Sequence, residues 1–96
     1  MIKTVRQHMK EMITNTPLTA QDISKMIGIR EKEVYEHLEH IAKISSQREK
    51  FIIHHGQCRI CHFEFKKRTR FTTPGRCPIC KSESITRSRF EIVKKQ

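Results

Sequence analysis

The hydrophobic residues in the first half of the chain recur at the spacing of α-helices. Near the N-terminus, five of them fall on one helical face: Ile2, Val5, Met9, Met12 and Ile13. The segment Asn15-Thr16-Pro17 follows, and proline both interrupts a helix and restricts the residue before it. The pattern therefore predicts a first helix that ends before this proline.

A second helix is predicted from a start signal at Thr19. Thr19 is a good N-cap residue, and Asp22 stands three residues later, close to the pattern of a capping box. Leu18 and Ile23 occupy the positions of a hydrophobic staple across that cap. Gly28 then ends the helix, in the left-handed conformation that glycine adopts readily. The buried face of this helix is predicted to consist of Ile23, Met26 and Ile27.

A third helix is predicted over about residues 30–45, with Val34, Leu38 and Ile41 as its buried stripe. A short helix, a turn of three or four residues with glycine, and a longer helix together form a helix-turn-helix. Any other three-helix bundle is the alternative. Residues 18–29 resemble the corresponding part of many winged helix-turn-helix regulators.

The second half shows the alternation of apolar and polar residues that is typical of β-strands. Strands are predicted at residues 51–55, residues 63–67, around Ile85 and at residues 90–92. We expect residues 51–55 to pair with residues 89–93 as a two-stranded wing, with the intervening segment inserted at its tip. The alternative is two independent units joined at Ser45-Ser46-Gln47.

Four cysteines in two Cys-x-x-Cys pairs predict a metal site. Fifteen residues separate Cys58-Arg59-Ile60-Cys61 from Cys77-Pro78-Ile79-Cys80, a spacing that indicates a four-cysteine zinc site. Each pair forms a tight turn, and two turns offer a closed tetrahedron of thiolates about 2.3 Å from the ion. A closed shell leaves no open position for a substrate, so we predict one structural Zn²⁺, bound by Cys58, Cys61, Cys77 and Cys80. Iron in a rubredoxin-like electron carrier is the alternative, because its ligand set is the same.

These elements together predict an α+β protein: a three-helix winged helix-turn-helix with a four-cysteine zinc ribbon inserted in or following the wing. Residues 1–50 would form the helix-turn-helix, and residues 51–96 the wing strands and the zinc ribbon. His62 and Lys81 stand directly after the second cysteine of each pair, where glycine is common. We expect His62 to be a surface residue, because four thiolates already satisfy the ion.

Positive charge is concentrated in the second half. The formal net charge of the chain is +10. Residues 1–46 carry seven Lys or Arg and six Asp or Glu, a net of +1, whereas residues 47–96 carry thirteen and four, a net of +9. Four thiolates and one Zn²⁺ lower the second value to about +7. A basic region of this kind favours nucleic acid or another polyanion as partner. The alternative is that the basic residues only keep a small domain in solution. Together with the predicted helix-turn-helix, the charge leads us to expect double-stranded DNA.

The basic run between the two cysteine pairs is a candidate DNA contact. Lys66, Lys67, Arg68 and Arg70 are close together in the sequence and can pair with phosphates. The alternative is a solvated hairpin that binds nothing. Phe71 follows this run, and we expect it to pack against the ribbon rather than to stack on a base.

The third helix gives a mixed signal. In winged helix-turn-helix regulators this helix usually enters the major groove, and Arg30, Lys32 and His37 are the candidates for base contacts. Residues 30–43 carry three basic and four acidic residues, and a net charge of −1 does not attract phosphates. The alternative function is therefore a protein-interaction adaptor of the transcription machinery that uses the acidic side chains of this helix.

Other functional classes are disfavoured. The chain has no apolar run long enough to span a membrane, and charged residues interrupt its first twelve positions, unlike a signal peptide. We expect a cytoplasmic protein, in which paired cysteines are more often metal ligands than disulfides. No nucleophile–base pair, phosphate-binding loop or open metal position is evident, so no enzyme activity is expected. Either a monomer or a homodimer is compatible with the sequence, since many regulators bind paired half-sites.

As a whole, the chain resembles small prokaryotic, mainly archaeal, predicted transcriptional regulators that fuse a winged helix-turn-helix to a C-terminal rubredoxin-like zinc ribbon. The most specific motifs are Cys58-x-x-Cys61-His62-Phe63-x-Phe65-Lys66, Pro74-Gly75-Arg76-Cys77-Pro78-x-Cys80-Lys81-Ser82-Glu83 and Arg89-Phe90. The resemblance implies a DNA-binding regulator with a structural zinc site.

Overall fold

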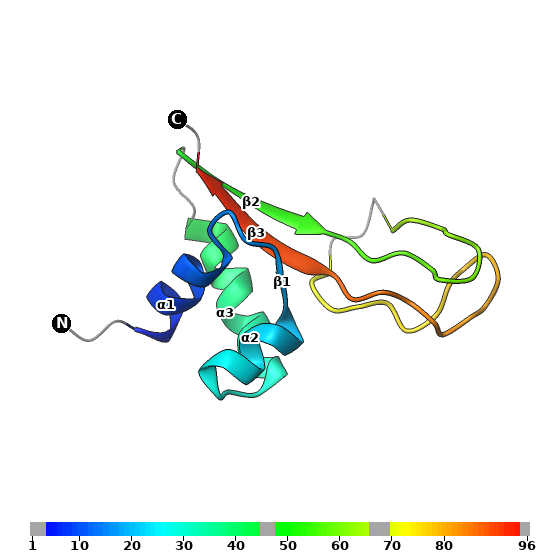
Figure 1. The fold of residues 1–96 in the computed structure, drawn as a ribbon, viewed down its shortest axis with the longest axis horizontal. Helices are drawn as coiled ribbons and strands as arrows, with labels where there is room; N and C mark the ends of the chain where they lie inside the picture. The colour runs from blue at the N-terminus through cyan, green and yellow to red at the C-terminus, as the bar shows by residue number, and fades with distance from the viewer. Residues whose placement is uncertain (1–3, 45–47, 66–69, 95–96) are drawn as a thin grey trace.

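Helices occupy the first half of the chain and precede most of the β-structure. The computed structural model describes residues 4–44, 48–65 and 70–94 of the 96-residue chain. Within these residues the protein is mixed α+β, with helices α1 (Val5–Ile13), α2 (Ala20–Ile27) and α3 (Glu31–Ile44). The strands β1 (Leu18–Thr19), β2 (Glu49–His54) and β3 (Arg89–Lys94) form an antiparallel sheet in the order β1-β3-β2. The helices lie on one side of the long β2–β3 hairpin (Figure 1).

The ends of α2 follow the sequence signals. The Thr19 side chain accepts a hydrogen bond from the Asp22 N–H at 3.0 Å, and the Asp22 carboxylate accepts one from the Thr19 N–H at 3.2 Å. Gly28 ends the helix with a left-handed φ of 84°, as predicted. A second capping box, between Thr4 and Gln7, starts α1. Such caps satisfy backbone N–H groups that the helix itself leaves unpaired.

One hydrophobic core joins the three helices to β3. Its buried members are Met9, Ile13, Ala20, Ile23, Val34, Leu38, Ile41, Phe90 and Ile92. Full burial of a large apolar side chain contributes roughly 1.5–3 kcal/mol, so this cluster is the main source of stability for the helical part. Two residues of the predicted hydrophobic faces are exposed: Met26 of α2 to 63% and Val5 of α1 to 39%. Both apolar faces are therefore narrower than expected. Ile2 lies outside the described residues.

The predicted pairing of the two distant strands is confirmed. β2 and β3 pair antiparallel, with Phe51 opposite Ile92 and Ile53 opposite Phe90. β1 pairs with the other edge of β3 through Leu18, which lies opposite Phe90. The sequence does not predict β1, because two residues, one of them a helix cap, are too few to show alternation.

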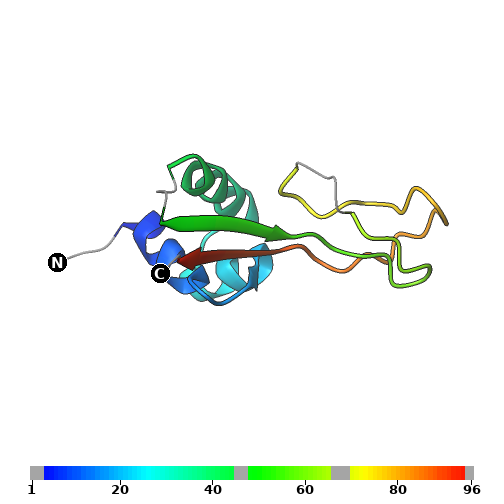
Figure 2. The ribbon, with the colours of Figure 1, turned by 90° about the horizontal axis from the view of Figure 1, so that it is seen from above.

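The chain between β2 and β3 projects from the end of their hairpin (Figures 1 and 2), and the molecule is 49 Å long. Both arms remain paired as they leave the sheet. The Gln57 N–H donates to Thr86 Oγ1 at 2.8 Å, and the Thr86 N–H donates to the Gln57 carbonyl at 2.9 Å. Gly56 is required at this junction, because a Cβ atom there would lie 1.9 Å from the Thr86 carbonyl oxygen.

Two predicted strands are only isolated β-bridges. Instead of a strand over residues 63–67, the described residues of that segment contribute the bridge between Gln57 and Glu64. The stretch around Ile85 contributes a bridge to Cys58. The tight cysteine turns bend the chain within a few residues of each bridge, so no longer ladder forms. Residues 66 and 67 lie outside the described residues.

Phe71 joins this projecting segment to the hydrophobic core. Its ring stacks on Phe51 and on Phe90, with ring centroids 5.8 Å apart in both pairs. The prediction that Phe71 packs is therefore right, but the predicted partner is wrong, because it packs against the sheet and the core rather than within the ribbon. The aromatic partners come from strands that are distant in the sequence, which sequence patterns do not reveal.

Polar contacts join α3 to the same region. Arg87 forms an ion pair with Glu31 of α3 at 3.1 Å. Tyr35, one turn further along α3, forms a side-chain hydrogen bond with Thr73, and its ring meets Phe90 edge-on at 6.3 Å. Burial, followed by the nearby Glu31 carboxylate, raises the pKa of Tyr35. The first turns of α3 are thus fixed against the base of the projection.

None of the helices in the described ranges has the length and apolar character of a membrane-spanning segment.

Candidate metal centre

Two turns with the same hydrogen-bond pattern hold the four cysteines. In the first turn, the Cys58 N–H donates to the Phe63 carbonyl at 2.9 Å, and the His62 N–H donates to the Cys58 carbonyl at 3.0 Å. The second turn has the same two bonds. The Cys77 N–H donates to the carbonyl of the residue five positions later at 2.8 Å, and the N–H of the residue four positions later donates to the Cys77 carbonyl at 3.0 Å. This repeated geometry turns both cysteine pairs toward one point.

The four sulfur atoms lie at the distances that one zinc ion requires. All four Sγ atoms are within 4.8 Å of one another. The Sγ atoms of Cys58 and Cys80 are 3.5 Å apart, as are those of Cys61 and Cys77. In a regular tetrahedron with about 2.3 Å between metal and sulfur, the sulfurs would be about 3.8 Å apart. The donor set therefore fits one tetrahedral, structural Zn²⁺.

Burial and hydrogen bonding differ among the four thiols. Cys58 and Cys77 are buried, whereas Cys61 and Cys80 are exposed. Backbone N–H donors, that of Cys61 foremost, lower the pKa of Cys58 to about 6. Burial opposes ionisation of Cys77, but backbone N–H groups of its turn, together with hydrogen bonds from the neighbouring thiols, lower its pKa. The Phe63 N–H favours the Cys61 thiolate, yet desolvation and the neighbouring sulfurs raise the pKa of Cys61 to about 12. Four thiolates in this space require a cation, which zinc supplies.

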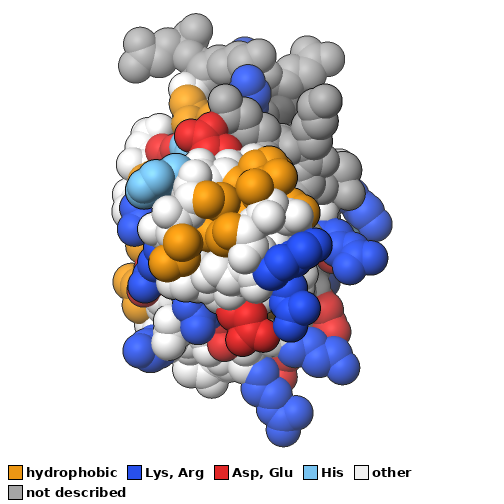
Figure 3. Space-filling model, turned by 90° about the vertical axis from the view of Figure 1, so that its right-hand side faces the viewer, with side chains coloured by type: hydrophobic (Ala, Val, Ile, Leu, Met, Phe, Trp, Pro, Cys, Tyr) orange, Lys and Arg blue, Asp and Glu red, His pale blue; other side chains and the backbone are white. Residues whose placement is uncertain are grey.

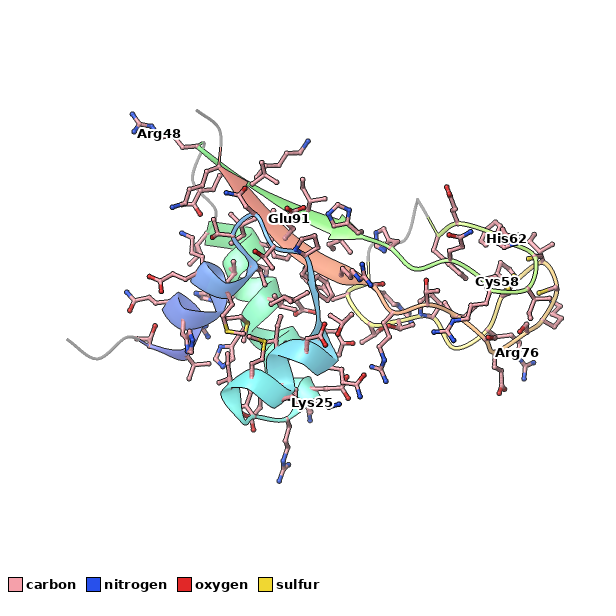
Figure 4. The ribbon with its side chains drawn as sticks, in the orientation of Figure 1. Lys25, Arg48, Cys58, His62, Arg76 and Glu91 are labelled. Atoms are coloured by element: carbon pink, nitrogen blue, oxygen red, sulfur yellow. The ribbon has the colours of Figure 1, made fainter. Side chains whose placement is uncertain are left out.

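The residue after each cysteine pair is in the left-handed region. His62 has a φ of 64° and Lys81 a φ of 66°, where residues with a Cβ atom are strained. His62 is exposed, as expected, and its Nδ1 lies 3.3 Å from Gln57 Nε2. Figure 4 shows Cys58 and His62 in the projecting segment, away from the helices.

The predicted DNA-contact residues have different environments. Arg30, directly before α3, and Lys32, in its first turn, are exposed, and so is Arg70. His37 is half-buried, and its Nδ1 accepts a hydrogen bond from Arg6 Nε of the α1 region at 3.0 Å. It therefore faces α1 rather than the outer side of α3. Lys66, Lys67 and Arg68 lie outside the described residues.

Sequence reasoning suggests that Arg87 and Arg89 extend the basic patch, but it does not group them with Arg59. Arg59, Arg87 and Arg89 line a common hollow beside the base of the projection. Arg59 lies on one arm of the projecting segment, Arg87 lies on the other arm, and Arg89 is the first residue of β3, so no local motif groups the three. Only the antiparallel pairing of the arms, which follows from the pairing of β2 with β3, could have brought them together.

The fold and the site together define a class of protein: a small helical unit with an antiparallel sheet, whose hairpin carries a four-cysteine, rubredoxin-like zinc ribbon. Residues 4–52 match the family described as PF0610-like, N-terminal, and residues 55–95 match the PF0610 rubredoxin-like zinc beta-ribbon domain. The chain belongs to the PF0610-like family.

A solved structure of similar fold is that of protein PF0610 from Pyrococcus furiosus, determined by solution NMR. It is 31% identical in sequence, with a TM-score of 0.76, and the match covers 95% of this chain and 90% of that chain. No curated protein matches the chain. The expected zinc ribbon, with a site for one structural Zn²⁺, is thus supported by its sequence family and by the geometry of the four sulfurs.

Proposed function

We propose that this protein is a DNA-binding transcriptional regulator and that its helical part is a winged helix-turn-helix. The order and pairing of the elements carry this proposal. Only three residues, Gly28–Arg30, separate α2 from α3, and the antiparallel β2–β3 hairpin follows α3. A short glycine-containing turn between two helices is typical of a helix-turn-helix, and the hairpin then occupies the place of a wing.

The charge on α3 limits what this helix contributes to affinity. Its outer face carries exposed Lys32, Glu36, Glu39 and Lys43, a mixture that does not attract phosphates. Glutamate at such a position can still accept a hydrogen bond from the cytosine amino group in the major groove. α3 would therefore select bases in this proposal, while other parts of the protein supply most of the binding free energy.

Phosphate attraction comes from the second half of the chain. Residues 47–96 carry a net charge of +9 before the zinc site is counted, and phosphate contacts usually dominate the affinity of DNA-binding proteins. We assign these contacts to Lys66, Lys67, Arg68 and Arg70. The ribbon would thus act as an enlarged, basic wing.

A salt titration of duplex binding tests the proposal. Zinc-loaded protein should bind a short duplex at about 50 mM salt, and log K should fall linearly with log salt by about 0.9 for each phosphate contact. The four assigned contacts contribute about −3.6 to this slope, and any further phosphate contact adds to it. Absence of binding at about 50 mM salt would remove this function.

A pair of single substitutions tests where the contacts lie. Arg70→Gln should make the slope shallower by about 0.9. Arg48→Gln removes the same charge at the opposite end of the hairpin (Figure 4) and should leave the slope unchanged. Equal effects of the two substitutions would show that binding follows net charge rather than the ribbon surface.

A second candidate function is a protein-interaction adaptor of the transcription machinery, and one feature of the ribbon favours it. Ile60 and Ile79 occupy equivalent positions in the two cysteine turns, and each is 65% exposed. Viewed from the ribbon end, hydrophobic side chains gather near the middle of the surface, with Lys and Arg at its edge (Figure 3). Paired apolar side chains beside positive charge suit an apolar and acidic protein surface.

Affinity capture from a nuclease-treated lysate tests the adaptor function. A partner that uses the ribbon should be lost with the double variant Ile60→Ser/Ile79→Ser and retained with a charge reversal of Glu33, Glu36 and Glu39. The opposite result would place the partner on the acidic face of α3. No specific partner with any of these proteins would end the adaptor proposal.

A further inference from the structure

A hollow of about 650 Å³ lies where the β2–β3 hairpin passes into the ribbon. It is bounded by the start of α2, by the ends of β2 and β3, and by both arms of the ribbon. Its charged or titratable lining consists of His54, His55, Arg59, Arg87 and Arg89. None of the described residues that line it is an aspartate or a glutamate.

The register of the sheet sets the position of the central arginine. Arg89 of β3 lies opposite Thr19 of β1 on one side and opposite His54 of β2 on the other. Its neighbour Phe90 points into the core, and successive side chains of a strand point to opposite faces. Arg89 therefore lies on the face away from the core, with a hydroxyl and an imidazole beside it.

The other two arginines are positioned by the ribbon. Arg87 is two residues before Arg89, in the arm that leads into β3, and its side chain lines the same hollow. Arg59 reaches the hollow from the opposite arm, where its backbone N–H donates to the Ser84 carbonyl at 2.9 Å. The pairing of the ribbon arms thus brings three guanidinium groups to one concave surface.

The nearest carboxylates neutralise only part of the positive charge of the three arginines. Glu31 forms an ion pair with Arg87 at 3.1 Å, and Glu91 lies 2.9 Å from Nε2 of His54. A guanidinium has five N–H donors, so Arg87 keeps donors for another acceptor. Arg59 and Arg89 have no ion-pair partner among the described residues. Three fork-shaped donors without a lining carboxylate fit a tetrahedral, multiply charged anion better than a carboxylate or chloride.

We infer that this hollow is a phosphate-binding site. The amino end of α2 forms one wall through Thr19 and Gln21. The Asp22 carboxylate caps this end and offsets its partial positive charge, so the attraction for the ligand comes from the arginines. The volume exceeds that of a single phosphate and suits a phosphate attached to a sugar. The inference rests on the proposed function for the identity of the ligand. The phosphate would be a backbone phosphate of DNA that is bound across the base of the ribbon. A free nucleotide offers the same chemistry.

The test uses zinc-loaded full-length protein and two probes. In the first arm, adenosine monophosphate is titrated at constant ionic strength while ¹H–¹⁵N spectra follow the Arg59 and Arg89 side-chain N–H groups and the Gln21 amide. In the second arm, binding of a short duplex is measured against salt. Four variants are compared: Arg59→Gln, Arg89→Gln, the double variant of these two, and the matched control Arg48→Gln. Zinc content and spectral dispersion establish that each variant is folded.

We expect saturable shifts at the hollow and a salt slope that is shallower by about 0.9 for each of the two hollow variants. The double variant Arg59→Gln/Arg89→Gln should bind the duplex at least tenfold more weakly at low salt, and Arg48→Gln should match the unchanged protein.

If the nucleotide shifts the signals of the hollow but no duplex binds, the phosphate site stands and the proposed DNA function fails. If the duplex binds with unchanged slopes in both hollow variants and the nucleotide does not shift the signals of the hollow, the proposed function stands and the inference fails. If the slopes are unchanged but the nucleotide does shift these signals, the phosphate site stands and DNA is not its ligand. If neither probe affects the hollow, the inference is wrong.

Discussion

The helical part and the zinc ribbon differ in how many side chains each removes from water. Nine buried residues from α1, α2, α3 and β3 form a continuous core. Between Gln57 and Thr86, the buried apolar side chains of the described residues are those of Cys58, Pro74 and Cys77. Two of these three are zinc ligands, so the ribbon has almost no apolar core of its own.

This difference shows that the zinc ion takes the place of a hydrophobic core in the ribbon. A structural zinc ion contributes roughly 10–16 kcal/mol of apparent binding free energy in comparable small sites. Burial of a few large apolar side chains contributes a comparable amount. The helical part therefore obtains its structure from a distributed core, whereas the ribbon depends on four bonds to one ion. The boundary between the region stabilised by the core and the region stabilised by zinc lies at Phe71, Arg87 and Gly56.

The largest effect is expected from removing a buried zinc ligand. Cys58→Ser takes away a thiolate that no other side chain in the described part of the ribbon replaces. We expect the protein to lose stoichiometric zinc and the ribbon to lose its fixed structure, while α1, α2 and α3 remain. Elemental analysis and far-ultraviolet circular dichroism measure the two outcomes. His62→Asn is the matched control and should retain one zinc per chain; retention of zinc by Cys58→Ser would contradict the account.

The corresponding test of the helical part is Phe90→Ala. Phe90 is fully buried and contacts the rings of Tyr35, Phe51 and Phe71. Truncation of a buried phenylalanine destabilises by about 3–5 kcal/mol, so the helices should unfold at much lower denaturant concentration. Zinc should still bind with nearly unchanged affinity, because its ligands are elsewhere. Simultaneous loss of zinc would mean that the ribbon depends on the core, against the proposed separation.

The junction between the two regions is tested by Gly56→Ala. The added Cβ atom would collide with the Thr86 carbonyl, and overpacking of this kind costs about 1–3 kcal/mol. Since this carbonyl is backbone, the arms of the ribbon must shift. Gly75→Ala is the matched control, because nothing lies within 4 Å of its added Cβ atom. Thermal unfolding of both variants should show a lower midpoint for Gly56→Ala only.

The smallest effect is expected from relieving backbone strain at the residue that follows a cysteine pair. Lys81→Gly relieves left-handed backbone strain of about 1–3 kcal/mol, and the added chain entropy of glycine offsets about 0.5–1 kcal/mol of it. We expect a net gain of about 1 kcal/mol. The gain should appear as about fivefold slower transfer of zinc to a competing chelator, with Lys81→Ala as the control. Faster transfer from Lys81→Gly would show that the turn is not strained at this position.

Local signals made most of the helical part predictable. Thr19, Asp22 and Gly28 fix the ends of α2 through interactions within a few residues, and the stripe of α3 follows from periodicity alone. The zinc ligands were equally predictable from the sequence, because the spacing of the cysteine pairs determines the geometry of each turn. The pairing of β2 with β3 could be inferred because few other strands were available to complete a hairpin.

Features that depend on contacts between distant segments were not predictable in the same way. The stacking of Phe71 on Phe51 and Phe90 and the ion pair of Arg87 with Glu31 require the docked arrangement of the ribbon. His37 has the periodicity of an outward position, yet Arg6 of a different segment fixes its ring. The arginine-lined hollow is likewise a product of strand register, which single positions in the sequence do not encode.

The central claim, that one zinc ion holds the ribbon while the core holds the helices, is tested most directly by metal removal. Purified protein should contain one zinc and no iron per chain. After treatment with a strong chelator, ¹H–¹⁵N spectra should show amide signals between Gln57 and Thr86 collapsing to random-coil positions. Signals of core residues such as Ile23 and Leu38 should remain dispersed. A metal-free protein whose ribbon signals stay dispersed would contradict the account.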